Sequence, residues 1–328
     1  MEIIFFGNGD FASDLLDGML RVELRPRAVI TGPDRPVGRG LRRTPSPVAA
    51  LAASVGLPLH KFAGPREAGL REVLSRERPQ AVLVADYGHL IPRDVLDLFP
   101  ERFLNVHPSL LPLYRGAAPI RRALLDGVEV SGVSLMVMVE SLDAGPLIGQ
   151  AETPVLPDDD AGELRRRLAL RGADLVAERL PRYLRGELVA EPQDESRATY
   201  AAPVEKHELR IDWGQPAVYV HNRVRAFAPR PGAWTCWRGG RLKILRTRQR
   251  REASGLRAGE LRRINGERLV VGTGEGELEL LLLQPEGRKR MTAAEFLRGY
   301  RPAEGETFSS PGGERHCVSK ESGDDGLG

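Results

Sequence analysis

The N-terminal part of the chain alternates short apolar runs with segments whose apolar residues recur at helical spacing. A short apolar run is typical of a buried strand, and a spacing of three or four residues is typical of a helix. This pattern predicts strands at 2–6, 28–31, 57–60, 81–85, 103–106 and 133–139, and an antiparallel edge strand at 147–151. It predicts helices at 11–20, 48–55, 67–76, 93–97, 120–125 and 161–184. Such alternation predicts an α/β fold with a doubly wound, mostly parallel Rossmann-like sheet.

The pattern changes in the C-terminal part. Residues 186–203 are polar and contain Pro192 and Pro203, which favours a linker. A helix is expected at 218–227, followed by short strands between glycine turns at 233–237, 242–245, 267–271 and 278–283. Short strands separated by such turns predict a smaller OB-like β-barrel. The predicted organisation is an α/β domain at 1–185, a linker at 186–203, a barrel domain at 204–303 and a disordered tail at 304–328.

Charge is unevenly distributed along the 328 residues, although the formal net charge is only +3. Residues 204–301 contain 21 Lys and Arg against 11 Asp and Glu, whereas residues 1–203 contain 25 against 28. The tail at 302–328 contains 2 against 6. A basic domain beside a nearly neutral one favours a polyanionic partner such as a nucleic acid. A general bias toward arginine is the alternative explanation.

The cysteines and the N-terminus give no sign of a disulfide framework, a metal site or a targeting signal. Cys236 and Cys317 are far apart, which predicts neither a disulfide framework nor a zinc site. The N-terminus has no signal-peptide pattern, and no apolar run approaches the length needed to span a membrane. We therefore expect a cytoplasmic protein without a bound metal. The oligomeric state is not fixed by the sequence, and a monomer is expected.

Two polar residues stand at the end of a predicted buried strand. Asn105 and His107 are two positions apart, so their side chains project from the same face of the strand. Pro108 follows and ends the strand, which leaves both side chains at its carboxyl end. Ligands of open α/β sheets bind at that end. A buried histidine that only packs in the core is the alternative at this position.

The segment that follows contains a specific motif. It continues with Ser109-Leu110-Leu111-Pro112 and then with Tyr-Arg-Gly-Ala-Ala-Pro-Ile at 114–120. Together with Asn105-x-His107-Pro108 this string resembles the signature of the folate-dependent formyltransferases. The resemblance extends from residue 3 to about residue 301 and includes further motifs at 33–40, 45–48, 87–88, 142–145, 210–213 and 225–227. One departure is Asn8-Gly9, where the family often has Thr-Pro.

The resemblance implies a reaction and a catalytic trio. Within the family the chain is most similar to enzymes that act on initiator tRNA. It implies transfer of the formyl group of 10-formyltetrahydrofolate to the amino group of methionine on initiator methionyl-tRNA. Acyl transfer of this kind needs donors for a developing oxyanion and groups that move protons, without a metal. By resemblance, Asn105 and His107 would polarise the formyl oxygen, and Asp143 would orient His107 and help to move the proton.

The resemblance also implies two binding regions. Ser109, Leu110, Leu111 and Pro112 match the turn that contacts the folate, and Tyr87 is expected to close the other side of that site or to cap the core. The segment 32–47 matches the family's inserted loop for the tRNA acceptor end. Its four arginines, Arg35, Arg39, Arg42 and Arg43, would contact phosphates, with Arg39 in the central position.

Three alternative functions compete with this one. Gly7-x-Gly9-x-x-Ala12 partly fits a dinucleotide fingerprint, but the acid expected at the end of the second strand is missing, so a nicotinamide enzyme is disfavoured. An amino-sugar nucleotide formyltransferase would share the trio but would not need the basic loop and basic domain. A non-catalytic RNA-binding relative would not need Asn105, His107 and Asp143 to be intact.

Overall fold

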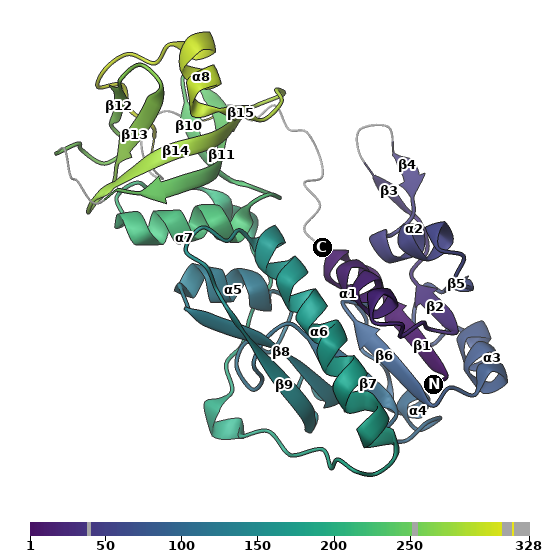
Figure 1. Ribbon diagram of the computed structural model, residues 1–328. Helices are drawn as coiled ribbons and strands as arrows, with labels where there is room; N and C mark the ends of the chain where they lie inside the picture. The colour runs from purple at the N-terminus through teal and green to yellow at the C-terminus, as the bar shows by residue number, and fades with distance from the viewer. Residues whose placement is uncertain (38–40, 251–254, 310–316, 318–328) are drawn as a thin grey trace.

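The computed structural model describes residues 1–37, 41–250, 255–309 and 317. It consists of an α/β domain followed by an antiparallel β domain (Figure 1). The predicted fold class, a mostly parallel Rossmann-like sheet followed by a smaller β domain, is confirmed. Among the described residues, the helices are too short or too polar to cross a membrane.

The α/β domain is built on a seven-stranded sheet with the order β5-β2-β1-β6-β7-β8-β9. Its strands are β1 (Ile3–Gly7), β2 (Ala28–Thr31), β5 (Leu59–Lys61), β6 (Ala81–Ala85), β7 (Phe103–His107), β8 (Val130–Val137) and β9 (Leu147–Pro154). The first five strands in this order run parallel. The chain starts in the middle of the sheet at β1 and crosses over between β1 and β6, which is the position where doubly wound folds bind ligands.

Helices cover both faces of this sheet, as expected for a doubly wound fold. One face packs against α1 (Asp10–Arg21), α2 (Pro47–Ser54), α5 (Pro119–Asp126) and α6 (Ala161–Leu184). The other face packs against α3 (Ala68–Glu77) and α4 (Arg93–Leu96). The longest helix, α6, begins with a capping box in which Asp160 and Glu163 satisfy each other's backbone N–H groups.

The direction of β8 corrects the sequence prediction. The strand predicted at 133–139 was placed in the parallel alternation, but β8 runs antiparallel to β7, with His107 opposite Ser134. The connection at 108–129 contains α5, and β8 and β9 then form an antiparallel extension of the sheet. Asp143 therefore does not follow a parallel strand. It reaches the carboxyl end of β7 because the loop between β8 and β9 folds back toward this strand.

The basic segment 32–47 contains a small hairpin that the sequence pattern did not reveal. Strands β3 (Arg35–Val37) and β4 (Arg42–Thr44) pair antiparallel between β2 and α2. The hairpin projects from the α/β domain on the upper side of Figure 1, the side that also carries the C-terminal domain. Helix α2 starts directly after it, where Ser46 caps the helix by accepting a hydrogen bond from the Ala49 N–H.

The C-terminal domain is an antiparallel sheet with the order β10-β11-β14-β13-β12, and β15 pairs with β14. Two single 3₁₀ turns, η1 (Glu195–Arg197) and η2 (Lys206–Leu209), precede it. Its elements are α7 (Ala217–Phe227), β10 (Ala233–Trp237), β11 (Gly240–Gln249), β12 (Leu261–Ile264), β13 (Arg268–Gly272), β14 (Glu277–Pro285), β15 (Met291–Thr292) and α8 (Ala293–Tyr300). Helix α7 packs on α5 and α6, so one buried apolar cluster continues from the α/β domain into this domain.

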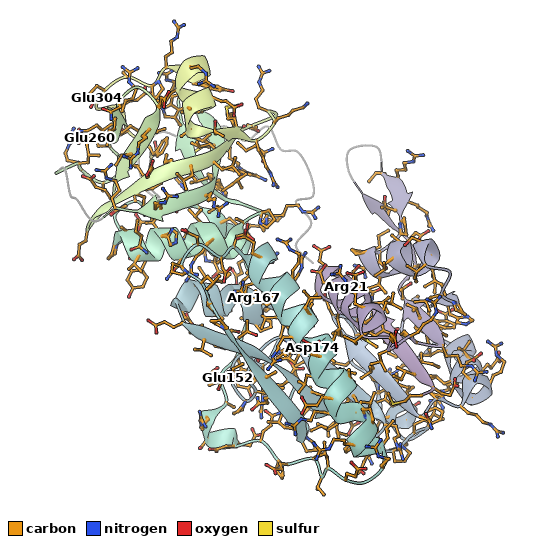
Figure 2. The ribbon with its side chains drawn as sticks, viewed as in Figure 1. Arg21, Glu152, Arg167, Asp174, Glu260 and Glu304 are labelled. Carbon is orange, nitrogen blue, oxygen red and sulfur yellow. A yellow bond between two sulfur atoms is a disulfide. The ribbon has the colours of Figure 1, made fainter. Side chains whose placement is uncertain are left out.

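The first residues of the predicted disordered tail are ordered in the structure, which corrects that prediction. Residues 305–309 hydrogen-bond to the segment 259–261 on one side, and Ser309 pairs with Cys236 of β10 on the other. Phe308 is buried against Trp213. These residues thus link the two edges of the sheet. Glu260 and Glu304, labelled in Figure 2, mark this end of the domain.

The cysteine prediction is also corrected. Cys236 and Cys317 form a disulfide that joins positions 81 residues apart, with their Cα atoms separated by 5.7 Å. Sequence distance was a poor guide here, because the segment after α8 returns to β10 and brings Cys317 back to the strand that carries Cys236.

Candidate active site

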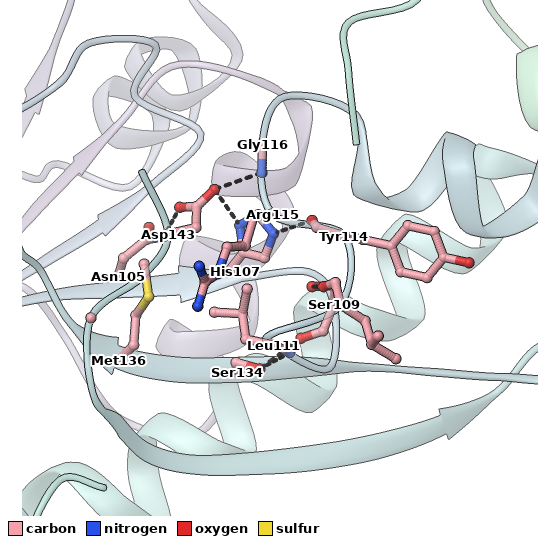
Figure 3. Close-up of polar contacts among 12 residues, drawn as sticks. Asn105, His107, Ser109, Leu111, Tyr114, Arg115, Gly116, Ser134, Met136 and Asp143 are labelled. Atoms are coloured by element: carbon pink, nitrogen blue, oxygen red, sulfur yellow. Dashed lines mark hydrogen bonds and ion pairs between the residues drawn. The ribbon is translucent and has the colours of Figure 1, made fainter. Parts of the chain in front are cut away.

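Asn105, His107 and Asp143 lie together at the carboxyl end of β7 (Figure 3). Asn105 and His107 come from β7, and Asp143 comes from the loop between β8 and β9. The Asn105 Nδ2 atom lies 3.5 Å from Asp143 Oδ1, and the His107 Nδ1 atom lies 3.7 Å from Asp143 Oδ2. The structure therefore places an amide, an imidazole and a carboxylate around one point.

The hydrogen bonds of His107 assign its two ring nitrogens. Nε2 lies 2.9 Å from the backbone oxygen of Tyr114, and the imidazole is only 5% exposed. A carbonyl oxygen can only accept, so Nε2 carries a proton in this contact. Nδ1 is then the nitrogen that can take up or release a proton, and it faces Asp143. The His107 ring is thus oriented from both sides.

Asp143 is held in a tight turn. Its backbone has a positive φ of 50°, and its Oδ2 atom accepts a 2.8 Å hydrogen bond from the Gly116 N–H. A side chain at Gly145 would place a Cβ 1.7 Å from the Val137 oxygen, so only glycine fits the close approach there. Within the motif at 142–145, the backbone therefore requires Gly145, and the Gly116 N–H binds the Asp143 carboxylate.

The turn predicted to contact folate is fixed against the antiparallel strands. The Ser109 hydroxyl donates to the Leu113 oxygen at 2.6 Å. The Ser134 hydroxyl donates to the Ser109 oxygen at 2.7 Å and accepts from the Leu111 N–H at 3.0 Å. Gln150 also binds the Leu111 oxygen. Ser109 and Leu111 are buried, and the Leu111–Pro112 peptide is cis.

A cavity of about 680 Å³ lies on one side of the loop that carries Asp143. It is lined by residues 63–67 and 89–92 and by Glu140. Neither Tyr87 nor the turn at 109–112 is part of its wall. Tyr87 is instead buried beneath it, edge-on to the rings of Phe6 and His89, and burial raises the pKa of its hydroxyl to about 12. Tyr87 thus supports His89 in the wall.

A second cavity, of about 450 Å³, lies against the same loop. Its walls come from the loop after β7, from residues flanking Asp143 and from the segment before the C-terminal domain, namely Arg115, Val139, Ser141, Leu142, Ala144, Glu195 and Tyr200. Glu140 lines the first cavity, whereas Val139 and Ser141 on either side of it line the second. The loop at 139–144 therefore lies between the two cavities.

The glycine-rich turn after β1 is occupied by a carboxylate. A Cβ on Gly9 would lie 1.8 Å from Asp86 Oδ2, and Asp86 accepts a hydrogen bond from the Phe11 N–H at the start of α1. The carboxylate thus takes the place at the helix N-terminus where a dinucleotide fingerprint would hold its pyrophosphate. Asp86 as a whole is exposed to solvent, but neighbouring protein atoms at Gly9 and the start of α1 crowd its carboxylate. This crowding, with the nearby charge of Asp10, raises its pKa to about 6.

Three of the predicted tRNA-binding arginines lie on the β3–β4 hairpin and not beside the trio. Arg35 belongs to β3, Arg42 and Arg43 belong to β4, and all three are exposed. Arg39 falls outside the described residues. Among the described residues, no group of His, Cys, Asp and Glu side chains is arranged to hold a metal ion.

Sequence reasoning missed two buried polar residues next to the trio. Arg115 is only 2% exposed, and Gln193 is 9% exposed. Arg115 stands in the quoted motif, so the motif itself was the available signal. Gln193 lies in the segment interpreted as a linker, and a single polar residue in a polar segment carried no signal.

Comparisons with known proteins agree with this geometry. The chain matches the formyl transferase family model over residues 1–180 and the formyl transferase C-terminal domain model over residues 203–301. It is 47% identical to a methionyl-tRNA formyltransferase from Thermus thermophilus, over 93% of this chain and 98% of that protein.

Two solved structures share the fold at low identity. HypX from Aquifex aeolicus in complex with tetrahydrofolic acid is 19% identical, with a TM-score of 0.66. The match covers 93% of this chain, which spans about half of HypX (48%). WlaRD, a sugar 3N-formyl transferase, is 16% identical, with a TM-score of 0.61 over 88% of this chain and 99% of that one. The two family models and the close relative show that this chain belongs to the formyl transferase family.

Proposed function

We infer that this chain transfers the formyl group of 10-formyltetrahydrofolate to the amino group of methionine on initiator methionyl-tRNA. The observation that carries this inference is the trio of Asn105, His107 and Asp143, brought together from β7 and a distant loop. The identity to the Thermus relative supports the choice of methionyl-tRNA as the acceptor. A cytoplasmic, monomeric enzyme is part of the proposal.

Each member of the trio has a role in the reaction. The amine attacks the formyl carbon, an oxyanion develops on the formyl oxygen, and the bond to N10 of the folate then breaks. The Asn105 amide donates a hydrogen bond to the oxyanion. His107 accepts the proton of the attacking amine on Nδ1 and returns it toward N10, while its Nε2–H remains on the Tyr114 oxygen. Asp143 stabilises the imidazolium that forms.

The folate donor is assigned to the cavity of about 680 Å³ beside Glu140. The volume falls within the usual range for a cofactor-sized ligand, roughly 300–1,000 Å³. The backbone at 89–92 supplies hydrogen-bonding groups, and Leu90 and Ile91 supply apolar wall. In this proposal the turn at 109–112, with Ser109, Leu110, Leu111 and Pro112, acts by holding the Tyr114 carbonyl and the Gly116 N–H in place, in addition to any contact with the folate.

The tRNA is assigned to the β3–β4 hairpin and the basic C-terminal domain. Arg35, Arg42 and Arg43 are exposed and can reach phosphates, and Arg39 lies in the same segment of the sequence. The main alternative acceptor is an amino-sugar nucleotide. It would not explain the basic hairpin or the charge of residues 204–301, which contain 21 basic and 11 acidic residues.

One assay separates the two acceptors. Purified protein and 10-formyltetrahydrofolate are offered methionyl-tRNA or an amino-sugar nucleotide, and formylation is measured on each. We expect transfer to methionyl-tRNA only. Transfer to the sugar alone would replace the proposed acceptor, and no transfer to either would leave the non-catalytic relative as the better description.

A further inference from the structure

The segment at 191–201, which we call the strap, crosses the back of both catalytic loops. Its backbone pairs with the loop after β7, where the Arg115 N–H donates to the Thr199 oxygen at 2.9 Å and the Ala201 N–H donates to the Arg115 oxygen at 2.7 Å. The Thr199 hydroxyl also accepts from the Tyr114 N–H at 2.8 Å. At its other end, Glu191 pairs with Leu147 at the start of β9. The strap is therefore tied to both sides of the site.

Gln193 is the buried side chain of the strap that connects these two sides. Its Nε2 atom donates to the backbone oxygen of Asp143 at 2.8 Å and to the backbone oxygen of Gly145 at 2.7 Å. Its Oε1 atom accepts from Arg115 Nη2 at 2.7 Å and from Arg115 Nε at 3.1 Å. Arginine can only donate and carbonyls can only accept, so these four contacts fix the orientation of the amide.

Arg115 continues the connection toward the trio. It is almost fully buried and also pairs with Glu195 of the strap. Its two sequence neighbours hold the catalytic side chains, because the Tyr114 carbonyl accepts from His107 and the Gly116 N–H donates to Asp143. The positions of His107 and Asp143 therefore both depend on elements that Gln193 contacts.

We propose that Gln193 is a positioning residue for formyl transfer, which sets the Asp143 carboxylate against His107 by holding the Asp143 and Gly145 carbonyls. Asp143 and Tyr114 both have positive φ angles, of 50° and 58°, which non-glycine residues adopt only when their surroundings enforce them. Gln193 and Arg115 supply that enforcement. This inference rests on the proposed function, since it concerns the rate of the reaction.

Two substitutions at Gln193 test the proposal. Gln193→Ala removes these four hydrogen bonds together with the weaker contact of Nε2 with Met136 Sδ. Gln193→Glu keeps the shape and the acceptor for Arg115 but sets an oxygen against the two carbonyls. We expect both to lower kcat by about 10- to 100-fold, because a misplacement of about 1 Å can cost about 10²-fold. The Michaelis constants for folate and methionyl-tRNA should change by less than about threefold, because the side chain acts on the transition state and not on binding.

A matched control comes from the neighbouring position. Asp194 is exposed, and its carboxylate caps η1 by accepting from the Ser196 N–H and hydroxyl. Asp194→Ala loosens the strap without touching the catalytic loops, so kcat should stay within about twofold. Thermal melting of every variant separates unfolding from a loss of positioning.

A double-mutant cycle gives the readout that a merely structural role would not move. If Gln193 acts through Asp143, Gln193→Ala should change single-turnover rates by less than about threefold in an Asp143→Ala background. A full loss in that background, an unchanged kcat in Gln193→Glu, or an equal loss in Asp194→Ala would overturn the proposal. If the wild-type enzyme does not formylate methionyl-tRNA, the result contradicts the proposed acceptor and not the role of Gln193. The same double-mutant cycle is then run with the amine that the enzyme does formylate.

Discussion

The catalytic loops and the β3–β4 hairpin are built in opposite ways, although both belong to the same domain. The loop at 107–116 and the segment 143–145 are buried or half-buried, although 139–142 are exposed, and both are joined to each other and to the strap by side-chain and backbone hydrogen bonds. The hairpin exposes Arg35, Arg42 and Arg43, and its two strands pair with each other. Proton transfer needs fixed atoms, whereas a grip on phosphates needs accessible charge. In the proposed function, one fold would meet both requirements with these two regions.

The largest effect should follow from removing the fixed groups. His107→Ala and Asp143→Ala should each lower kcat by at least two orders of magnitude, since positioned acid–base groups contribute about 10²–10⁴-fold. Steady-state formylation of methionyl-tRNA measures the loss, and circular dichroism shows whether each variant is folded. A folded His107→Ala enzyme with nearly native turnover would end the mechanism proposed here.

The hairpin should give a smaller effect that is confined to one substrate. Arg42→Ala and Arg39→Ala should each reduce kcat/KM for methionyl-tRNA by about tenfold to a hundredfold. A charge-assisted contact with a phosphate contributes about 1.5–3 kcal/mol. The Michaelis constant for folate and the Tm should hardly change, since the described hairpin arginines are exposed and do not pack in the core.

Arg78→Ala is the matched control, because Arg78 is exposed and precedes β6, at the opposite end of the sheet from the trio. It should leave both substrates unaffected. A hairpin defect that appears in the folate constant and spares the tRNA constant would remove the assignment of the hairpin to tRNA.

Salt concentration should affect the proposed tRNA contacts of the hairpin. Affinity of the full chain for methionyl-tRNA should fall steeply as salt rises, because bound phosphates release counterions. Replacing both Arg42 and Arg43 with alanine should reduce the slope of log K against log salt by about two. Filter binding over a salt series measures it, and Arg78→Ala should keep the wild-type slope. A salt-insensitive complex would contradict the electrostatic model.

The smallest effect concerns Asp86, a charge held close to the rigid region. Its folded pKa, about 6, lies above its ordinary value, so the folded state favours the protonated form. Its contribution to stability is therefore present at pH below about 4 and is lost as the pH rises through about 6. Asp86→Asn should raise the Tm at pH 7.5 and not at pH 4. Because the side chain is partly exposed, the gain should stay below about 1 kcal/mol.

Thermal melting at the two pH values measures this difference. Asp17→Asn, on the exposed side of α1 beside Arg21, is the control and should show no such pH-dependent gain. A lower Tm for Asp86→Asn at pH 7.5 would mean that the carboxylate stabilises the start of α1 more than its burial costs.

Local pattern predicted most of the α/β fold from the sequence. The ranges 28–31, 81–85 and 161–184 agree with β2, β6 and α6 to the residue, because apolar periodicity over a buried face is strong there. The direction of β8 was wrong, since an apolar run indicates burial but not direction. The β3–β4 hairpin, β12 and α8 were missed because their apolar pattern is short or interrupted by arginines.

The site divides in the same way. The Asn105 and His107 pairing follows from period two on one strand, so the sequence could place them together. Asp143 was assigned by the family motif, and the loop that delivers it could not be foreseen. Gln193 was out of reach, because its role depends on four long-range hydrogen bonds made by a segment without periodicity. The disulfide was also missed, because it joins positions 81 residues apart and no local pattern signals such a contact.

The segment at 305–309 has a consequence for biosynthesis. The edges of β10 and β12 acquire their last partners from residues that the ribosome adds after every strand of the sheet. Until then the edge of β12 lacks its partner at Leu261, and the edge of β10 is paired only where Ile211 binds Trp234; such incompletely paired edges recruit other chains. A chain truncated after α8 would lack these partners in every copy. We therefore expect aggregation to be the main defect of such a chain, ahead of any loss of activity.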